Sequence, residues 1–260
     1  MFCSIIGYPL KKPRSIVLWK KFFRKKKINS RMLPLEIKNK SFNKTIKNLK
    51  NDKNFLASAI TMPYKIKINK MIDILDISSK LSGSTNLIIK KRNLFYGFNT
   101  DIYGFLESLG KRINMKDIII IGLGGAGMAI FKYIFKKYKK KNFILVTKKR
   151  IKKNARLKVY RKINTKKIEK EKKYLIINCT PIGSDLQKSF IKLSPLSSSF
   201  LQYINKKSYV FDLIYQPEKN VLYQMCQKKK ISYSNGLKMN TYQADKALKI
   251  ISKLTKFKVF

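Results

Sequence analysis

Histidine is absent from this chain, and acidic residues are scarce: 13 Asp and Glu accompany 60 Lys and Arg among 260 residues. Without histidine the chain cannot complete the common Cys/His zinc sites. Cysteine is also rare, and Cys3, Cys179 and Cys226 lie far apart with no C-x-x-C pair. We therefore expect no bound metal, and we interpret the cysteines as free, mostly packed thiols in a reducing cytosol.

Long apolar runs are missing as well. The longest, Ile118–Phe131, is interrupted by four glycines and is too short to span a bilayer. The N-terminus is apolar first and basic afterwards, which is the reverse of a secretory signal. We therefore expect a soluble, cytoplasmic protein without a membrane partner.

The most unusual feature is the formal net charge of +47. Such a balance raises the hypothesis of a nucleic-acid-binding protein or an anionic-membrane partner. An alternative is compositional, because the abundant Lys, Asn, Ile, Phe and Tyr have A/T-rich codons. Lysines are spread over the whole chain, and no basic groove interleaved with aromatic residues is visible. We therefore favour the compositional explanation and expect no specific nucleic-acid partner.

Apolar patterning predicts an α/β fold, and 44% hydrophobic residues suffice for a buried core. In the first hundred residues, short strands alternate with amphipathic helices, and Ser15 is a candidate helix N-cap. The predicted strands and helices there are Phe2–Ile6, Ser15–Phe23 (helix), Phe55–Ile60, Met71–Ile77 (helix), and a hairpin of Leu87–Ile89 with Leu94–Tyr96.

The second half predicts a parallel sheet built from βαβ units. Its expected strands are Ile118–Ile121, Phe143–Thr147, Leu175–Asn178 and Tyr209–Asp212, with a helix over Met128–Lys137 and a terminal helix over Met239–Leu254.

A G-x-G-x-x-G sequence follows the first of these strands and precedes its helix. Gly122 permits a tight turn, Gly124 lets a pyrophosphate approach the backbone, and Gly127 lets helix and strand pack closely. A glycine-rich structural turn is the alternative, but the strand-turn-helix context favours a dinucleotide site.

The end of the next strand indicates which dinucleotide is bound. An NAD enzyme usually offers an acidic residue there to hold the ribose 2′-hydroxyl. This chain offers Thr147, Lys148, Lys149 and Arg150, and cations suit a 2′-phosphate. We therefore predict NADP as the cofactor, although a composition this rich in lysine could produce such a cluster by itself.

The chain resembles the shikimate dehydrogenases over nearly its whole length. The family patterns N-V-T-x-P-x-K, G-x-N-T-D, G-A-G-G-A-x, I-I-N-A-T-P-x-G, D-x-x-Y and D-G-L-x-M-L-x-x-Q occur in order. They are matched by residues 60–65 (I-T-M-P-Y-K), 97–101 (G-F-N-T-D), 122–127 (G-L-G-G-A-G), 176–183 (I-I-N-C-T-P-I-G), 211–215 (F-D-L-I-Y) and 235–243 (N-G-L-K-M-N-T-Y-Q). The resemblance implies NADPH-dependent reduction of 3-dehydroshikimate to shikimate, a step of aromatic amino acid biosynthesis.

The resemblance also implies a catalytic pair, Lys65 and Asp101. Hydride reduction of a ketone leaves an alkoxide that needs a proton, and in a chain without histidine a lysine oriented by a carboxylate is a suitable donor. Lys65 taken alone would be a surface lysine; its motif and the matching Asp101 favour the catalytic role. Implied substrate contacts are Ser15, Thr61, Asn86, Tyr215 and Gln243. Implied cofactor contacts are Gly122, Gly124, Gly125, Ala126, Gly127, Thr147, Lys148, Lys149, Thr180, Leu213, Gly236 and Met239.

Several positions depart from the family pattern. Pro13 replaces the first hydroxyl of an early S-x-S, and Arg14 is a candidate substitute for it. Ala59 and Asn235 replace Asn and Asp, and 148–150 (K-K-R) replaces N-R-T. These changes predict weaker affinities. They also leave open a quinate/shikimate or aminoshikimate dehydrogenase of the same fold.

The resemblance implies two domains. An N-terminal α/β substrate domain would comprise residues 1–101 and 237–260, and a Rossmann-type parallel-sheet NADP-binding domain residues 102–236. The sequence is compatible with a monomer or a homodimer.

Overall fold

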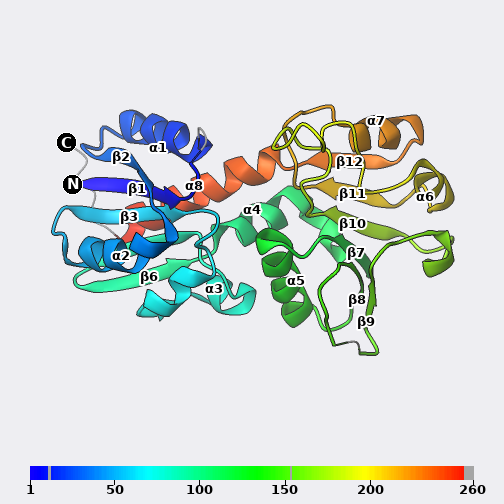
Figure 1. Cartoon of the computed structure of the whole chain (residues 1–260), viewed down its shortest axis with the longest axis horizontal. Helices are drawn as coiled ribbons and strands as arrows, with labels where there is room; N and C mark the ends of the chain where they lie inside the picture. Colours follow the sequence, from blue (N-terminus) through cyan, green and yellow to red (C-terminus); the bar gives the residue numbers. More distant parts are fainter. Residues whose placement is uncertain (11–12, 153, 255–260) are drawn as a thin grey trace. The chain divides into compact units, whose positions relative to one another are not determined.

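The computed structural model describes residues 1–10, 13–152 and 154–254 (Figure 1). Its contacts divide the chain into two compact units. Unit 1 comprises Met1–Gly104 and the chain from Thr241 onward, and unit 2 comprises Phe105–Asn240. Each unit contains a six-stranded sheet flanked by helices, so the predicted α/β class is confirmed.

The sheet of unit 1 is mixed, with strand order β2-β1-β3-β5-β6-β4. β1 pairs in parallel with β2 and β3, whereas β5 runs antiparallel to both β3 and β6. The predicted hairpin is therefore confirmed as β5–β6. The strands are β1 (Phe2–Gly7), β2 (Arg31–Glu36), β3 (Phe55–Ile60), β4 (Ile74–Leu75), β5 (Leu87–Lys91) and β6 (Leu94–Phe98).

Helices cover both faces of this sheet because the strand residues alternate between two apolar clusters. Cys3 and Ile5 face a cluster with Trp19 of α1 and Leu248 of α8, while Ile6 faces a second cluster built on α2. The helices of the unit are α1 (Arg14–Lys25), α2 (Phe42–Asn51), α3 (Ile77–Ser82), the start of α4 (Thr100–Leu109) and most of α8 (Leu237–Leu254).

The prediction of a helix over Met71–Ile77 is wrong. Lys67–Met71 forms a 3-10 helix, Ile74–Leu75 forms β4 beside β6, and a helix begins only at Ile77. Two carboxylates explain the break. Asp73 accepts a hydrogen bond from the backbone N–H of Phe95 at 2.7 Å, and Asp76 caps α3 by accepting from Ser78 N at 2.8 Å. Side chains bonded to the backbone in this way favour turns and caps over helix interiors.

The sheet of unit 2 is entirely parallel, with strand order β12-β11-β10-β7-β8-β9. β7 and β10 lie side by side although they are distant in sequence, so the connections diverge at this point, as in doubly wound dinucleotide-binding folds. Ligands of such folds bind at the carboxyl ends of the two diverging strands. The strands are β7 (Asp117–Ile121), β8 (Asn142–Val146), β9 (Leu157–Tyr160), β10 (Tyr174–Asn178), β11 (Tyr209–Asp212) and β12 (Ser232–Asn235).

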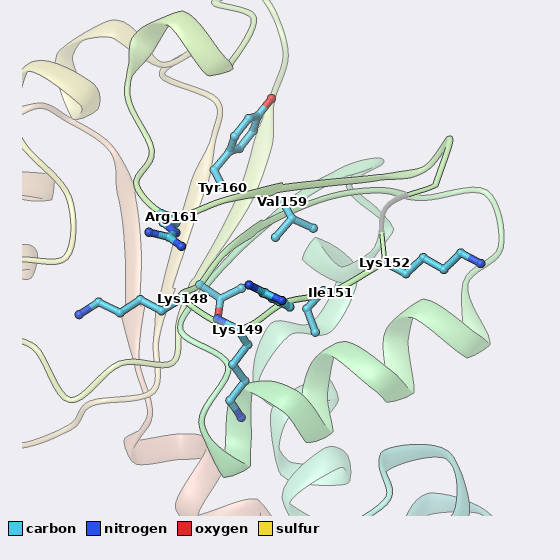
Figure 2. Close-up of a pocket in the computed structure, with 9 residues that line it drawn as sticks. Lys148, Lys149, Ile151, Lys152, Val159, Tyr160 and Arg161 are labelled. Atoms are coloured by element: carbon cyan, nitrogen blue, oxygen red, sulfur yellow. The ribbon is translucent and has the colours of Figure 1, made fainter.

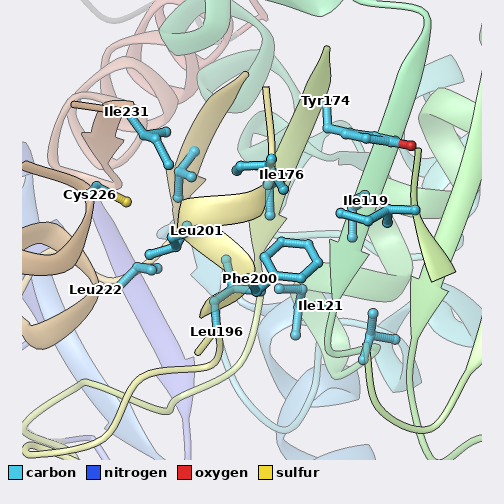
Figure 3. Close-up of a cluster of buried hydrophobic side chains, with 14 of the residues drawn as sticks. Ile119, Ile121, Tyr174, Ile176, Leu196, Phe200, Leu201, Leu222, Cys226 and Ile231 are labelled. Atoms are coloured by element: carbon cyan, nitrogen blue, oxygen red, sulfur yellow. The ribbon is translucent and has the colours of Figure 1, made fainter. Parts of the chain in front are cut away.

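Both faces of this sheet are buried, which explains the unbroken isoleucine run of β7. Ile119 and Ile121 point into a cluster with Phe200 of α6 and Leu222 of α7 (Figure 3). Ile118 and Ile120, on the opposite face, are also buried. The helices of the unit are α5 (Gly125–Lys137), α6 (Ser198–Tyr203) and α7 (Val221–Lys228), with short 3-10 helices at Gly110–Asn114 and Thr165–Lys167. A further 3-10 helix, Asn39–Ser41, belongs to unit 1.

Within residues 1–10, 13–152 and 154–254, no helix has the length and apolar character needed to cross a bilayer.

Candidate functional site

Lys65 and Asp101 form an ion pair in unit 1. The Nζ of Lys65 lies 2.6 Å from Oδ2 of Asp101, and the two side chains are 26% and 20% exposed. Lys65 lies in the turn after β3, and Asp101 lies in the first turn of α4, where the helix dipole favours a negative charge. The ammonium is therefore held by a single, defined partner while it remains accessible to solvent or to a ligand.

Two consecutive residues before β5 connect the backbones that carry this pair. The N–H of Thr85 donates to the carbonyl of Lys65 at 2.7 Å. The Oδ1 of Asn86 accepts the N–H of Thr100 at 2.7 Å, and the Nδ2 of Asn86 donates to Oγ1 of Thr100 at 3.0 Å. One short segment thus positions both the turn of Lys65 and the start of the helix of Asp101.

Gln243 joins the same hydrogen-bonded group from α8. Its Oε1 accepts from Asn86 Nδ2 at 3.4 Å and from Thr100 Oγ1 at 3.3 Å. Of the substrate residues implied by the family resemblance, Asn86 and Gln243 are therefore brought together, although they are 157 positions apart.

The remaining substrate candidates lie elsewhere. Ser15 is half-buried in the first turn of α1, and the N-cap of that helix is Pro13, so the prediction that Ser15 caps it is wrong. Proline presets the extended conformation at the cap, which moves the helix start one residue upstream. Thr61 directly follows β3, and its N–H donates to Ile6 O at 2.9 Å. Tyr215 belongs to unit 2.

Asn99 and Thr100 belong to the site but were not singled out from the sequence. The Nδ2 of Asn99 donates to the side-chain and backbone oxygens of Ser84 at 2.8 and 2.9 Å, and its Oδ1 accepts the N–H of Ile102 at 3.3 Å. Asn99 therefore fixes the first turn of α4, which carries Asp101. Both residues are within the G-F-N-T-D motif, which was the available signal.

In unit 2, the glycine-rich loop has the close packing that its pattern predicts. Gly122 has φ +87°, and a Cβ there would lie 2.6 Å from Cγ2 of Thr180. A Cβ on Gly127 would overlap the carbonyl oxygen of Gly122 and lie 2.8 Å from Cβ of Cys179. Only glycine fits these two positions without displacing the backbone of the loop and the segment after β10.

Gly124 and Gly125 differ from these two glycines because a Cβ on either would meet nothing within 4 Å. Gly124 is the N-cap of α5, and it supplies no side-chain cap to the free N–H groups of the first turn. Open space in front of free N–H groups at the start of a 13-residue helix suits a phosphate.

A group of cations surrounds the carboxyl end of β8. Thr147 is buried, and its Oγ1 accepts the N–H of Lys149 at 3.1 Å, while Lys148, Lys149 and Arg150 are exposed. These residues line a cavity of about 460 Å³ together with Arg161, which belongs to the segment after β9. Figure 2 shows Lys148, Lys149 and Arg161 at this cavity.

A neighbouring cavity of about 550 Å³ joins the cations to the glycine-rich loop. It is lined by Gly122, Gly124, Thr147, Lys148, Lys149, Arg161, Lys162 and Thr180, among others. None of the described residues that line either cavity is acidic. Arg161 and Lys162 were not anticipated from the sequence.

The remaining cofactor candidates lie near the ends of β11 and β12. The N–H of Leu213 donates to Asn178 O at 3.0 Å, and Gly236 packs directly on the carbonyl of Leu213. Met239 is buried in α8. These residues follow adjacent parallel strands, so their positions agree with a ligand site at that edge of the sheet.

Asp212, the last residue of β11, holds this edge of the sheet through hydrogen bonds. Its carboxylate is buried and accepts from Asn178 Nδ2 and Asn220 Nδ2 at 2.9 Å each, from Ile214 N at 3.0 Å and from Tyr233 OH at 3.1 Å. Burial raises the pKa of Asp212, although these four hydrogen bonds oppose the shift. The four donors fix the backbone that leads to Leu213 and Tyr215.

The three cysteines are free. Burial raises the pKa of Cys3 and Cys226 to about 12 and also raises the pKa of Cys179, so the thiols are chemically quiet at neutral pH. Among the described residues, no cluster of Cys, Asp or Glu is arranged to hold a metal ion.

Together these features fit an adenine dinucleotide that carries a 2′-phosphate. The open start of α5 suits the pyrophosphate, and the cations beyond β8, without a nearby carboxylate, suit the additional phosphate.

A family model described as the shikimate dehydrogenase substrate binding domain matches residues 5–88. A relative from Dictyoglomus thermophilum, named shikimate dehydrogenase (NADP(+)), is 30% identical over 252 residues, which cover 93% of this chain and 88% of the relative.

Solved structures show the same similarity. Shikimate dehydrogenase 1 from Peptoclostridium difficile has a TM-score of 0.77 and 26% identity, over 98% of this chain and 92% of that one. Shikimate 5-dehydrogenase from Thermus thermophilus, solved with NADP(H) and shikimate, shares the fold with a TM-score of 0.78 at 19% identity, over 98% and 94%.

Proposed function

Since the chain belongs to the shikimate dehydrogenase family, we propose that it catalyses the reversible, NADPH-dependent reduction of 3-dehydroshikimate to shikimate in aromatic amino acid biosynthesis. The observation that carries this proposal is the ion pair between Lys65 and Asp101, whose Nζ and Oδ2 lie 2.6 Å apart. The chain has no histidine that could transfer the proton instead.

Lys65 would act as the general acid in this reaction. When bound, NADPH supplies the hydride that reduces the ketone. The Nζ of Lys65 donates a proton to the substrate oxygen as negative charge develops there. The Oδ2 of Asp101 accepts a second ammonium proton, which orients the lysine.

Neutral polar side chains would hold the substrate hydroxyls and carboxylate. Asn86 and Gln243 supply amide donors and acceptors next to the start of α4, and Thr61 precedes Lys65 by four residues. We propose that Ser15 and Tyr215 complete this set. Unit 1 would be the substrate-binding and catalytic domain.

Unit 2 would bind NADP. We propose that the start of α5 (Gly124–Gly127), together with Gly122 and Thr180, holds the pyrophosphate. Thr147, Lys148 and Lys149 would hold the 2′-phosphate. Leu213, Gly236 and Met239 would line the nicotinamide end. The free thiols and the use of NADPH suit a reducing cytoplasm, where we propose that the protein works as a monomer or homodimer.

The test is the loss of NADPH absorbance with purified protein and 3-dehydroshikimate. The assay is repeated with NADH and with dehydroquinate. Because an expression host can contribute its own enzyme, Lys65→Met purified in parallel sets the background.

Rapid NADPH loss with 3-dehydroshikimate alone, absent from Lys65→Met, is the expected result. Faster turnover of dehydroquinate would indicate a quinate/shikimate dehydrogenase of the same fold. No turnover with any pair, from protein whose circular dichroism shows a folded chain, would overturn the proposal.

A further inference from the structure

Arg161 reaches the predicted 2′-phosphate site through the pairing of two parallel strands. β8 and β9 pair with Val146 opposite Tyr160, and the N–H of Thr147 extends the ladder by donating to Tyr160 O at 2.8 Å. Thr147 and Arg161 are the first residues after the two strands, so Lys148, which follows Thr147, leaves the same edge of the sheet as Arg161. Lys148 and Arg161 line the same two cavities although 13 positions separate them in sequence.

The position of Arg161 distinguishes it from the other arginine of this region. Arg161 lines both the cavity around Lys148–Lys152 and the cavity that contains Gly122 and Gly124. Arg150 lines only the first of these. In Figure 2, Arg161 lies on the side of the cavity near Lys148, whereas Lys152 lies on the far side.

Abundance of cations cannot by itself identify a ligand contact in a chain with 60 of them. Two other observations carry the inference. Arg161 arrives from a different strand than the lysines, so the cations converge from two segments. The described residues lining both cavities include no carboxylate that would neutralise them.

The chemistry of the two side chains explains why the arginine matters. Lys148 and Lys149 are compact point charges that attract a phosphate without fixing its orientation. A guanidinium is planar and can donate two parallel hydrogen bonds to phosphate oxygens. The loop after β8 has lysine at both of these positions, and its arginine, Arg150, does not line the cavity that contains Gly122 and Gly124.

We propose that Arg161 is a specificity-determining residue that donates to the 2′-phosphate and so favours NADPH over NADH. This inference rests on the proposed function, because it assigns a residue to the same cofactor. It differs in its test, which needs no turnover.

The experiment measures binding of adenosine 2′,5′-bisphosphate and of 5′-AMP by isothermal titration calorimetry. The proteins are the full chain, Arg161→Gln, Arg161→Lys and Lys152→Gln. The last is a matched control, since it removes one positive charge from the wall of the same cavity at a residue outside the second one.

We expect Arg161→Gln to weaken adenosine 2′,5′-bisphosphate binding about 10- to 100-fold, as for a lost charge-assisted hydrogen bond. The affinity for 5′-AMP should change less than about 2-fold. Arg161→Lys should recover only part of the loss, and Lys152→Gln should change either affinity less than about 2-fold.

Three results would overturn the inference: equal losses for both ligands in Arg161→Gln, a loss no larger than that of Lys152→Gln, or an unmodified chain that does not distinguish the two nucleotides. Failure of the proposed function would look different. The unmodified chain would then bind adenosine 2′,5′-bisphosphate in an Arg161-dependent manner but would not reduce 3-dehydroshikimate.

Discussion

Lys65 and Lys149 are the same residue type in a very basic chain, but their surroundings differ. Lys65 is about three-quarters buried and pairs with one carboxylate at 2.6 Å. Lys149 is exposed and shares its cavity with Lys148, Arg161 and Lys162, without an acidic residue among the described lining. The first arrangement orients one ammonium, and the second leaves several positive charges for a ligand to neutralise.

The difference shows how function can be separated from composition here. A net charge of +47 makes every lysine unremarkable by count. Burial and partners are the basis of the proposed roles. In unit 1 a carboxylate orients the proposed proton donor, and in unit 2 cations converge without carboxylates, which suits an anion.

The largest expected effect comes from Lys65→Met. It removes the proposed proton donor and keeps the volume of the side chain, so kcat should fall on the order of 10³-fold. NADPH oxidation at saturating substrate measures this change, and a thermal melt checks the fold.

The control for this variant is Lys50→Met. Lys50 pairs with Asp73 at 2.7 Å in the same unit, with side chains 30% and 29% exposed. It should leave kcat within about 2-fold, as expected for an ion pair away from the chemistry. A comparable loss of kcat in Lys65→Met and Lys50→Met would mean that activity responds to the loss of either ion pair of unit 1. Such a result would contradict a special role for Lys65.

Gly127→Ala should have the next largest effect, this time in unit 2. The new methyl group would overlap the carbonyl oxygen of Gly122, so we expect a destabilisation of about 1–3 kcal/mol together with loss of NADPH affinity. Differential scanning calorimetry and NADPH fluorescence measure the two effects.

Gly124→Ala is the matched control because its methyl group meets nothing within 4 Å and its φ of −67° suits alanine. This variant should keep the thermal midpoint of unfolding but bind NADPH more weakly, since the methyl group occupies the space proposed for the pyrophosphate. An unchanged affinity for NADPH would place the pyrophosphate elsewhere.

Replacing both Lys148 and Lys149 with Gln should weaken NADPH binding about tenfold and leave NADH nearly unchanged, because exposed charges act mainly on the additional phosphate. The effect should shrink at high ionic strength, where salt screens exposed cations. Equal losses for NADPH and NADH would instead indicate a general electrostatic contribution of the cluster.

The smallest expected effect is the pH dependence of stability that comes from the Lys50–Asp73 ion pair of unit 1. Burial alone would raise the pKa of Asp73, but hydrogen bonds from Lys50 and from the N–H of Phe95 lower it overall. A carboxyl group with a lowered folded-state pKa contributes stability at neutral pH, and this contribution is lost as the pH falls through that pKa.

Asp73→Asn should therefore cost up to about 1 kcal/mol at pH 7, and the difference from the unmodified chain should narrow under acidic conditions. Urea unfolding across that pH range measures it. A gap that widens toward low pH would contradict the sign of the shift.

The sequence predicted the features that depend on local patterns. The four consecutive isoleucines and the glycines of β7 and its turn define a strand, a loop and a helix within 20 residues, and the structure confirms them. By contrast, β2 was not predicted, and its central Pro34 is unusual in a strand. The structure explains it as an edge strand that pairs only with β1, where a missing N–H is tolerated.

Features that depend on long-range pairing were beyond the sequence. Arg161 reaches the cation cluster only through the register of β8 and β9, and Gln243 meets Asn86 only because α8 returns to unit 1. The family resemblance pointed to Gln243 as a site residue, but it gave no signal for Arg161.

The most direct test of the contrast is the pair of values kcat and NADPH dissociation constant, measured for Lys65→Met and for the Lys148/Lys149→Gln variant in one buffer. The account predicts a crossed result: Lys65→Met binds NADPH normally with kcat reduced on the order of 10³-fold, whereas the double variant binds about tenfold more weakly with near-normal kcat at saturation. Parallel losses of affinity and kcat in both variants would contradict it.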